Sequence, residues 1–294
     1  MQHLVDVDSL SHKEIDKILK DANEFKNKPF IKLLDNRLII TLFFEPSTRT
    51  RSSFEVAAKR LGASVVHLDP SKSSTKKGET LEDTFANLCA MGPDGVIIRH
   101  SQNETAKILA NMQLAPVINA GTGKVAHPTQ ALLDLFTIKE YFNGDIEGKK
   151  VAIVGDIANS RVASSGIKLF KSVGLDVTLV APKEFMPKTE LKNTDNLEDI
   201  LDNIDLIISL RAQLERHQKP IFEDYNEYAK HYCITYDMIK NRNLAVMHPG
   251  PVMRNIDISD EVLQSSKSLV LRQVQNGVFV RMAVLKHLLL DNGN

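Results

Sequence analysis

The sequence has 294 residues, of which 43% are hydrophobic and 25% are charged, a composition typical of a soluble globular protein of about two domains. Lys plus Arg and Asp plus Glu both number 37, and this balance argues against a general nucleic-acid binder, which usually carries a basic excess. Two cysteines exclude a disulfide scaffold and a Cys-based zinc site, and a polar N-terminus without a long apolar run predicts a cytoplasmic protein that does not enter a membrane.

Short apolar runs, each followed by a polar or Gly/Pro-bearing turn, predict β-strands. They are rich in Val, Ile and Leu and show little alternation, which is typical of parallel strands buried on both faces. The predicted strands are 37–44, 64–68, 94–99, 115–119, 150–155, 176–181, 205–210 and 244–248. Helical patterns lie between them, at 54–61, 128–144 and 278–290. This alternation predicts an α/β fold: two open parallel-sheet domains with helices on both faces, joined by long helices.

The segment "NGDIEGK" (143–149) is a polar, Gly-bearing break in the middle of the chain. We place the domain boundary just before or at this segment. We expect one domain over 1–142, completed by a C-terminal helix at about 275–294, and a second domain over 143–274.

Polar groups follow nearly every predicted strand. They are "EPSTRTR" after 44, Arg99 and His100 after 98, "AGTGKVAHPTQ" after 119, "DIANSR" after 155, "RAQLER" after 210 and "PGPVMR" after 248. In open α/β sheets, ligands bind beyond the carboxyl ends of the strands. The pattern therefore predicts a shared active cleft suited to an anion or a carbonyl.

The stretch after residue 44 combines a strand end, a turn at Pro46 and a helix that Ser47 can cap. The first turn of a helix offers unpaired N–H groups and the positive end of the dipole. Thr48 and Thr50 add hydroxyls, and Arg49 adds a bidentate guanidinium. Together these groups favour a phosphate cradle. The alternative is a Ser-capped helix with a solvated Arg face.

Two other phosphate motifs are disfavoured. "GTGK" (121–124) is half a P-loop, but Ile118 stands where the first Gly would be and Val125 where Ser or Thr would hold magnesium. "VGDIANSRVASS" follows a strand and opens a helix without the GxGxxG of a dinucleotide site. ATP use and NAD binding are therefore disfavoured, and no His, Cys or carboxylate spacing suggests a metal.

Six motifs occur in order over nearly the whole chain and together resemble the aspartate/ornithine carbamoyltransferase family. They are "FFEPSTRTRSSFE", "KKGET", "IIRH", "HPTQALLDLFTI", "LRAQLERH" and "HPGPVMR". The later motifs look like the aspartate branch, because Pro249 follows His248 where ornithine enzymes carry a Cys, and no Ser-Met-Gly occurs. One departure is Thr122-Gly123 in place of the Asp-Gly of many members, which could alter the loop before His127.

The resemblance implies transfer of a carbamoyl group from carbamoyl phosphate to the α-amine of L-aspartate, in pyrimidine biosynthesis. The products would be N-carbamoyl-L-aspartate and phosphate, and the family needs no metal or organic cofactor. No side chain is an obvious nucleophile, so catalysis would come from positioning and electrostatics as the two domains close.

The resemblance also implies roles for individual residues. The expected carbamoyl-phosphate-binding residues are Ser47, Thr48, Arg49, Thr50, Ser74, Lys77, Arg99, His127, Gln130, Pro249 and Gly250, and the expected catalytic residues among them are Arg49, Thr50, Arg99 and His127. The expected aspartate-binding residues are Lys77, Arg161, Arg211 and Gln213. At "HPGP" we expect a tight turn of the kind in which a cis Gly250–Pro251 bond occurs. Taken alone, His127 fits a packing role. Arg161 and Arg211, each taken alone, fit a surface salt bridge.

The loop "DPSKSSTKKGET" (69–80) has no apolar anchor and fits a solvated basic loop. In the family, the matching Ser and Lys reach the neighbouring subunit's site. The resemblance thus implies this role for Ser74 and Lys77, or Lys76 if the register slips by one, and a homotrimer as the smallest active unit. The sequence does not predict whether regulatory chains attach. Alternative functions are transfer to ornithine or a related amine, an inactive homologue with a binding role, and a dinucleotide-dependent oxidoreductase.

Overall fold

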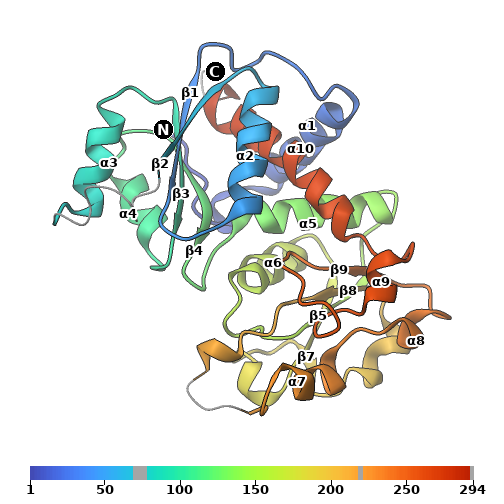
Figure 1. Ribbon diagram of the computed structural model, residues 1–294. Helices are drawn as coiled ribbons and strands as arrows, with labels where there is room; N and C mark the ends of the chain where they lie inside the picture. Colours follow the sequence, from blue (N-terminus) through green and yellow to red (C-terminus); the bar gives the residue numbers. More distant parts are fainter. Residues whose placement is uncertain (69–77, 218–220, 292–294) are drawn as a thin grey trace. The chain divides into compact units, whose positions relative to one another are not determined.

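A computed structural model describes residues 1–68, 78–217 and 221–291 (Figure 1). The chain forms two compact units, which we call the first unit (Met1–Phe136 with Val274–Asn294) and the second unit (Thr137–Gln273). The chain passes from one unit to the other within helix α5 (Pro128–Tyr141) and returns within helix α10 (Val270–Leu289). The segment 143–149, at which the sequence analysis placed the boundary, follows α5 in the second unit.

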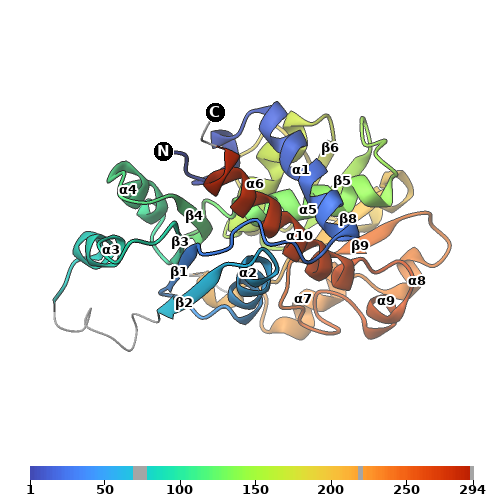
Figure 2. The same cartoon turned by 90° about the horizontal axis from the view of Figure 1, so that it is seen from above.

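The first unit contains a four-stranded parallel sheet of order β2-β1-β3-β4. Its strands are β1 (Leu38–Phe43), β2 (Ser64–Leu68), β3 (Gly95–His100) and β4 (Val117–Thr122), and its further helices are η1 (Val7–Ser9), α1 (His12–Asn27), α2 (Thr48–Arg60), α3 (Leu81–Cys89) and α4 (Thr105–Asn111). Helices α3 and α4 lie on one face of the sheet, whereas α1, α2 and α10 lie on the other (Figures 1 and 2).

Alternating side chains divide the core of the first unit between the two faces of the sheet. Ile40 and Leu42 of β1, with Val96 and Ile98 of β3, pack in one cluster with side chains of α3 and α4, such as Phe85. Because side chains in a strand alternate, the intervening residues point to the opposite face, and both faces are buried. This double burial explains the nearly continuous Val, Ile and Leu runs of the sequence.

Polar contacts hold α10 against two other helices of the first unit. Lys286 Nζ donates to Asp21 Oδ1 of α1 at 2.7 Å, and Arg281 Nη1 donates to Ser53 Oγ of α2 at 3.0 Å. The apolar pattern at 278–290 and the domain assignment of about 275–294 both predicted a later start for this helix, which begins at Val270. The first turns of α10 were missed because they have no apolar face in the sequence. Gln273, which is buried there, is polar, and the apolar Leu271 is 82% exposed.

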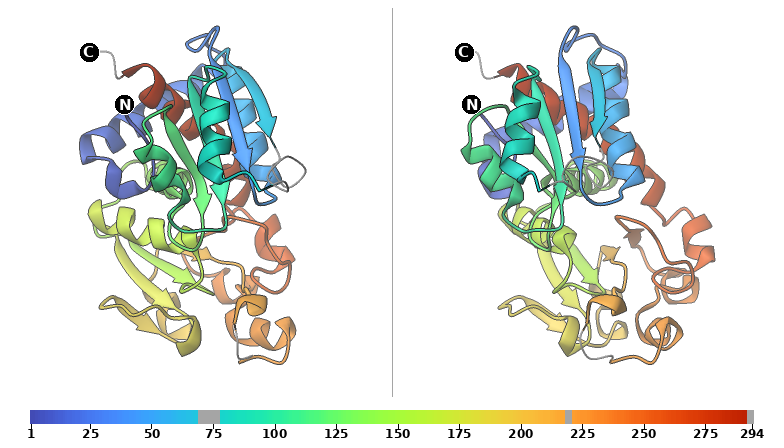
Figure 3. Two further views of the ribbon diagram at one scale, coloured as in Figure 1. Left: turned by 90° about the vertical axis from the view of Figure 1, so that its left-hand side faces the viewer. Right: turned by 60° about the vertical axis from the view of Figure 1, so that its left-hand side comes forward.

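The second unit contains a five-stranded parallel sheet of order β7-β6-β5-β8-β9. Figure 3 gives two further views of the ribbon, coloured by residue number. Its strands are β5 (Lys150–Val154), β6 (Asp176–Val180), β7 (Lys192–Thr194), β8 (Leu206–Ser209) and β9 (Ala245–Met247). Its helices are α6 (Arg161–Ser172), α7 (Tyr225–Tyr232), α8 (Tyr236–Ile239) and α9 (Asp260–Gln264), with 3₁₀ turns η4 (Lys183–Phe185), η5 (Glu198–Asn203) and η6 (Leu214–Arg216).

The predicted fold class is confirmed: each unit is an α/β layer structure around a parallel sheet, and every predicted strand is present. Strand β7 was not predicted, because the edge strand "KNT" contains no apolar residue. Within the described part of the chain, no helix has the length and hydropathy needed to cross a bilayer.

Candidate functional site

The predicted phosphate cradle lies where β1 leads into α2, beyond the carboxyl end of the strand. Ser47 occupies the N-cap position of α2, and its carbonyl oxygen accepts from the N–H of Arg51 at 3.1 Å. The expected side-chain cap is absent, since the Ser47 hydroxyl makes no capping hydrogen bond. Thr48 and Arg49 are exposed and Thr50 is buried. Because no acidic side chain occupies the first turn, its N–H groups and dipole are open to an anion.

Arg99 stands at the end of β3, the strand next to β1, and its carbonyl oxygen accepts from Phe44 N at 2.9 Å. Its guanidinium donates from Nη1 to the carbonyl oxygen of Ala120 at 3.1 Å, and its Nε lies 3.5 Å from Glu45 Oε2. The side chain is only 13% exposed. Arg99 therefore presents a positioned cation at the same sheet edge as the segment that leads into the cradle.

The loop between β4 and α5 has a fixed conformation in spite of its unusual sequence. Thr122 pairs with Ala126 across the loop, and its Oγ1 accepts from Asn119 Nδ2 at 3.0 Å. Gly123 has a φ of +48°, and a Cβ there would lie 1.8 Å from Asn103 Oδ1. The positive φ and the close approach of Asn103 therefore favour glycine at position 123. The Thr122-Gly123 departure leaves an ordered loop in front of His127.

His127 immediately precedes α5 and is buried. Its carbonyl oxygen accepts from the N–H of Gln130 at 3.0 Å and thereby starts the helix. Gln130 is also buried, and its Nε2 donates to Asp134 Oδ1 at 3.0 Å, which fixes the orientation of the side-chain amide. His127 and Gln130 thus lie on one helical turn beyond the carboxyl end of β4.

In the second unit, Arg161 is the first residue of α6, and Ser160 caps this helix by accepting from Ala163 N at 3.2 Å. Between β5 and α6, Gly155 adopts a φ of +119°, and a Cβ there would meet Leu210 O at 2.7 Å. Only glycine therefore allows the ends of β5 and β8 to approach this closely.

Arg211 and Gln213 follow β8 at that same sheet edge. Arg211 Nη2 pairs with the Glu215 carboxylate, which also accepts from Tyr225 Oη at 2.8 Å. Gln213 Nε2 donates to the carbonyl oxygen of Asn159 at 3.3 Å, two residues before Arg161. The structure thus brings together the loops that carry Arg161, Arg211 and Gln213, three of the four predicted aspartate-binding residues, and Arg211 makes an ion pair there.

The turn after β9 contains the expected cis Gly250–Pro251 bond, and Gly250 has a φ of +71°. The Gly250 N–H donates to His248 Nδ1 at 2.8 Å, so Nε2 carries the imidazole proton and faces Asp257 Oδ2 at 3.1 Å. Asp257 is fully buried and also accepts from Met253 N at 2.8 Å. A buried carboxylate therefore shapes the turn that carries Pro249 and Gly250.

Asp156 and Asp257 were not among the predicted site residues, although both are buried beside them. Asp156 Oδ1 accepts from Asn159 N, whereas Asp257 Oδ1 accepts from Ala212 N, next to Arg211. Asp156 could have been found from the sequence, because it directly follows the predicted strand at 150–155, where ligand-binding residues are expected. Asp257 lies in a segment without a pattern.

The predicted site residues that the structure describes form one set in each unit. The first-unit set is Ser47, Thr48, Arg49, Thr50, Arg99, His127 and Gln130, and the second-unit set is Arg161, Arg211, Gln213, Pro249 and Gly250. Each set lies beyond the carboxyl ends of its own sheet. Ser74 and Lys77, with the alternative Lys76, lie outside the described residues.

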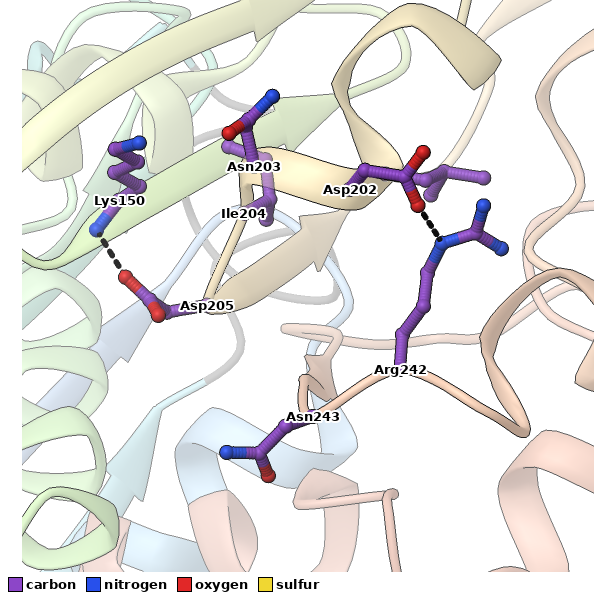
Figure 4. Close-up of a pocket in the computed structure, with 8 residues that line it drawn as sticks. Lys150, Asp202, Asn203, Ile204, Asp205, Arg242 and Asn243 are labelled. Atoms are coloured by element: carbon purple, nitrogen blue, oxygen red, sulfur yellow. Dashed lines mark hydrogen bonds and ion pairs between the residues drawn. The ribbon is translucent and has the colours of Figure 1, made fainter.

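A polar cavity of about 360 Å³ lies elsewhere in the second unit, where β5 and β8 begin (Figure 4). Asp202 there pairs with Arg242 Nε at 2.7 Å, and Asp205 accepts from the backbone N–H of Lys150 at 2.8 Å. None of the predicted site residues within the described ranges lines this cavity. Among the residues that the structure describes, no group of three or more His, Cys, Asp or Glu side chains is arranged to hold a metal.

The fold and these residues define a two-unit α/β protein with cations and hydrogen-bond donors at the carboxyl edges of both parallel sheets. Residues 2–140 match the family model for the carbamoyl-P binding domain of aspartate/ornithine carbamoyltransferases, and residues 147–288 match the model for their Asp/Orn binding domain. The chain belongs to the aspartate/ornithine carbamoyltransferase family, which confirms the resemblance seen in the sequence.

Three relatives illustrate this similarity. The aspartate carbamoyltransferase catalytic subunit of Sulfurovum sp. (strain NBC37-1) is 66% identical over the full length of both chains. The catalytic subunit of M. jannaschii aspartate transcarbamoylase superposes with a TM-score of 0.89 at 34% identity, again over the full length of both chains. The Trypanosoma cruzi aspartate transcarbamoylase, in complex with carbamoyl phosphate and aspartate, gives a TM-score of 0.88 at 29% identity over 98% of this chain and 97% of its own.

Proposed function

We propose that this chain transfers the carbamoyl group of carbamoyl phosphate to the α-amine of L-aspartate, giving N-carbamoyl-L-aspartate and phosphate. The observation that carries this proposal is the 66% identity, over both full lengths, to a protein named as an aspartate carbamoyltransferase catalytic subunit. A structural neighbour that binds carbamoyl phosphate and aspartate supports the same substrates. This activity supplies N-carbamoyl-L-aspartate for pyrimidine biosynthesis.

The first unit holds the carbamoyl donor in this proposal. The first turn of α2 binds the phosphate with its N–H groups and with the side chains of Ser47, Arg49 and Thr50. The open Ser47 hydroxyl supports this role, because the helix does not use it. Arg99 bridges the phosphate and the carbonyl oxygen, and His127 donates to that carbonyl. The charge that develops on this oxygen in the tetrahedral intermediate is stabilised by these donors.

The second unit holds the acceptor. Aspartate carries two carboxylates, and the guanidiniums of Arg161 and Arg211 match them in charge and geometry. Gln213 supports these contacts, and the same cations would repel the positive side chain of ornithine. The carbonyl oxygens of Pro249 and Gly250 accept from the carbamoyl NH2. The buried Asp257, which shapes the turn, supports their orientation.

The reaction proceeds by direct attack of the neutral α-amine on the carbamoyl carbon. The new C–N bond forms a tetrahedral intermediate, its C–O bond to phosphate then breaks, and the departing phosphate takes the proton that the amine loses. Atoms and charge balance without a protein nucleophile or a dedicated base. The rate enhancement comes from orientation of the two substrates and from fixed donors at the oxyanion.

We further propose a homotrimer in which Ser74 and Lys77 of one subunit reach a neighbour's site, with Lys77 contacting both substrates. The family resemblance of the segment "KKGET" supports this assembly. A cytoplasmic location is also part of the proposal.

A colorimetric assay for ureido products tests the proposed reaction. Purified protein with carbamoyl phosphate should form product with L-aspartate, release one phosphate per product, and form almost none with L-ornithine. Ornithine as the preferred acceptor, or carbamoyl phosphate that is bound but transferred to neither amine, would overturn the proposal.

A further inference from the structure

Arg281 of α10 is a buried cation that contacts the helix of the predicted cradle. The residue is only 4% exposed, and its Nη1 donates to Ser53 Oγ at 3.0 Å and to Gly277 O at 3.1 Å. Its Cζ lies 5.1 Å from the ring centroid of Phe54. Ser53 follows Thr50 by three residues in α2, which is less than one helical turn. The guanidinium therefore contacts α2 about one turn after the cradle residues.

Arg281 also interacts with α5, the helix that follows His127. Burial lowers the pKa of Arg281 to about 10, and the charge of Asp134 on α5 opposes this shift. The guanidinium is thus charged at neutral pH. Asp134 is itself buried and accepts from Gln130 Nε2 at 3.0 Å. A polar connection therefore runs from α2 through Arg281 to the helix that carries Gln130.

The sequence of α10 makes room for this buried cation. A Cβ at Gly277 would lie 2.6 Å from Arg281 Nη1 and 3.2 Å from Leu133 Cδ2. Glycine lowers the stability of a helix interior, and a buried charge has a desolvation cost. In addition, Arg281 Nε has no hydrogen-bond partner among the described residues. An apolar side chain here would avoid these costs, so fold stability alone does not explain the arginine.

We propose that Arg281 is a positioning residue for the carbamoyl donor. It holds the first turn of α2 and the start of α5 in the arrangement that the phosphate and the carbonyl group require together. It also places a positive charge behind the cradle, which favours a phosphate dianion. The identity of the donor rests on the proposed function, whereas the link between Arg281 and anion affinity does not.

A pair of serine variants tests this role without removing the buried charge. Ser53→Ala deletes the acceptor of Arg281 on α2, and Ser52→Ala is the matched control on an exposed neighbouring position. The dissociation constant of inorganic phosphate is measured by calorimetry, together with KM for both substrates, kcat and Tm. Ser53→Ala should raise KM for carbamoyl phosphate and Kd for phosphate about fivefold and leave KM for aspartate unchanged, and Ser52→Ala should match wild type.

Substitutions of the arginine separate its charge from its shape. Arg281→Met should weaken phosphate binding at least tenfold, and Arg281→Lys should recover most of that loss because the positive charge is kept. Equal phosphate affinity in wild type and Ser53→Ala, or a loss confined to Tm, would overturn the proposal. Tight phosphate binding without carbamoyl transfer in wild type would refute the proposed function but leave this comparison valid.

Discussion

His217 Nε2 lies 2.8 Å from the buried carboxylate oxygen Oδ2 of Asp156 and joins two loops of the second unit. The imidazole also stacks on Phe185, with 4.2 Å between ring centroids. Asp156 belongs to the loop that precedes Arg161, and His217 follows the segment that contains Arg211 and Gln213. This contact therefore fixes the loops of the proposed aspartate-binding residues against each other.

We predict that His217→Ala raises KM for aspartate about tenfold and leaves KM for carbamoyl phosphate unchanged. The variant removes a hydrogen bond to a buried carboxylate, an interaction of roughly 1.5–3 kcal/mol. His217→Gln should recover part of this loss because its amide can still donate. Steady-state kinetics with each substrate varied in turn measure the effect, and His231→Ala, on an exposed residue of α7, is the control. A change in both KM values would contradict a role limited to aspartate.

The strands could be predicted from sequence because each buried strand has a local signature. The run at 150–155 is an example, since both faces of the sheet require Val, Ile or Ala there. The three polar residues of β7 have no such signature. They form a strand only because their backbone pairs with the edge of β6.

Sequence motifs allowed site residues to be proposed, whereas the residues that support them in the fold left no such motif. Arg49 and His127 could be proposed from motifs whose members are close in sequence. Asp257 accepts from Ala212, 45 residues away, and Arg281 donates to Ser53, 228 residues away. Such contacts depend on how elements far apart in the chain pack together. They therefore cannot be predicted from the spacing of residues in the sequence.

Replacement of Arg49 and replacement of His127 should affect different kinetic constants. Arg49→Ala should raise KM for carbamoyl phosphate by about 100-fold, because the phosphate loses a bidentate charged partner. His127→Ala should instead lower kcat by roughly 100- to 1000-fold, because it removes a donor to the developing oxyanion. Lys59→Ala, at an exposed position of α2, should behave as wild type. Small and equal effects of Arg49→Ala and His127→Ala would refute the assigned roles.

The proposed trimer with shared sites predicts complementation between inactive variants. Lys77→Ala chains mixed with Arg49→Ala chains should regain part of the activity, because every mixed trimer contains one site with neither substitution. Arg49→Ala mixed with His127→Ala should regain none, since both residues come from the same chain in every site. Activity is measured after denaturation and joint refolding. Mixed trimers that are confirmed by mass but inactive in the first pair would exclude the shared site.

Both cysteine thiols should react slowly in the folded protein. Burial raises the pKa of Cys233 from 9.0 to about 11, with smaller contributions from Asp257 and Glu261, and burial also raises the pKa of Cys89 to about 11. At pH 8 the thiolate fraction is therefore roughly 100-fold below that of an unfolded chain, and the thiolate is the reactive form. Iodoacetamide labelling followed by mass spectrometry should show this difference.

The raised pKa values of the two cysteines also determine whether the free energy of unfolding rises or falls at alkaline pH. Between pH 9 and 11 the folded chain keeps thiol protons that the unfolded chain has lost, so these thiols lower folding stability as the pH rises through that window. A Cys233→Ala variant should lose less stability than wild type between pH 9 and 11 in urea titrations. An equal loss in both proteins would argue against the raised pKa of Cys233.

A crystal structure with a bisubstrate analogue, in which a phosphonate is joined to an aspartate dicarboxylate, tests most directly whether the two sets of residues act on one pair of substrates. We predict that the phosphonate lies within hydrogen-bonding distance of Ser47, Arg49 and Thr50, while the carboxylates of the same molecule contact Arg161 and Arg211. An analogue bound with its phosphonate away from the first turn of α2, or with its carboxylates away from both arginines, would contradict the proposed shared site.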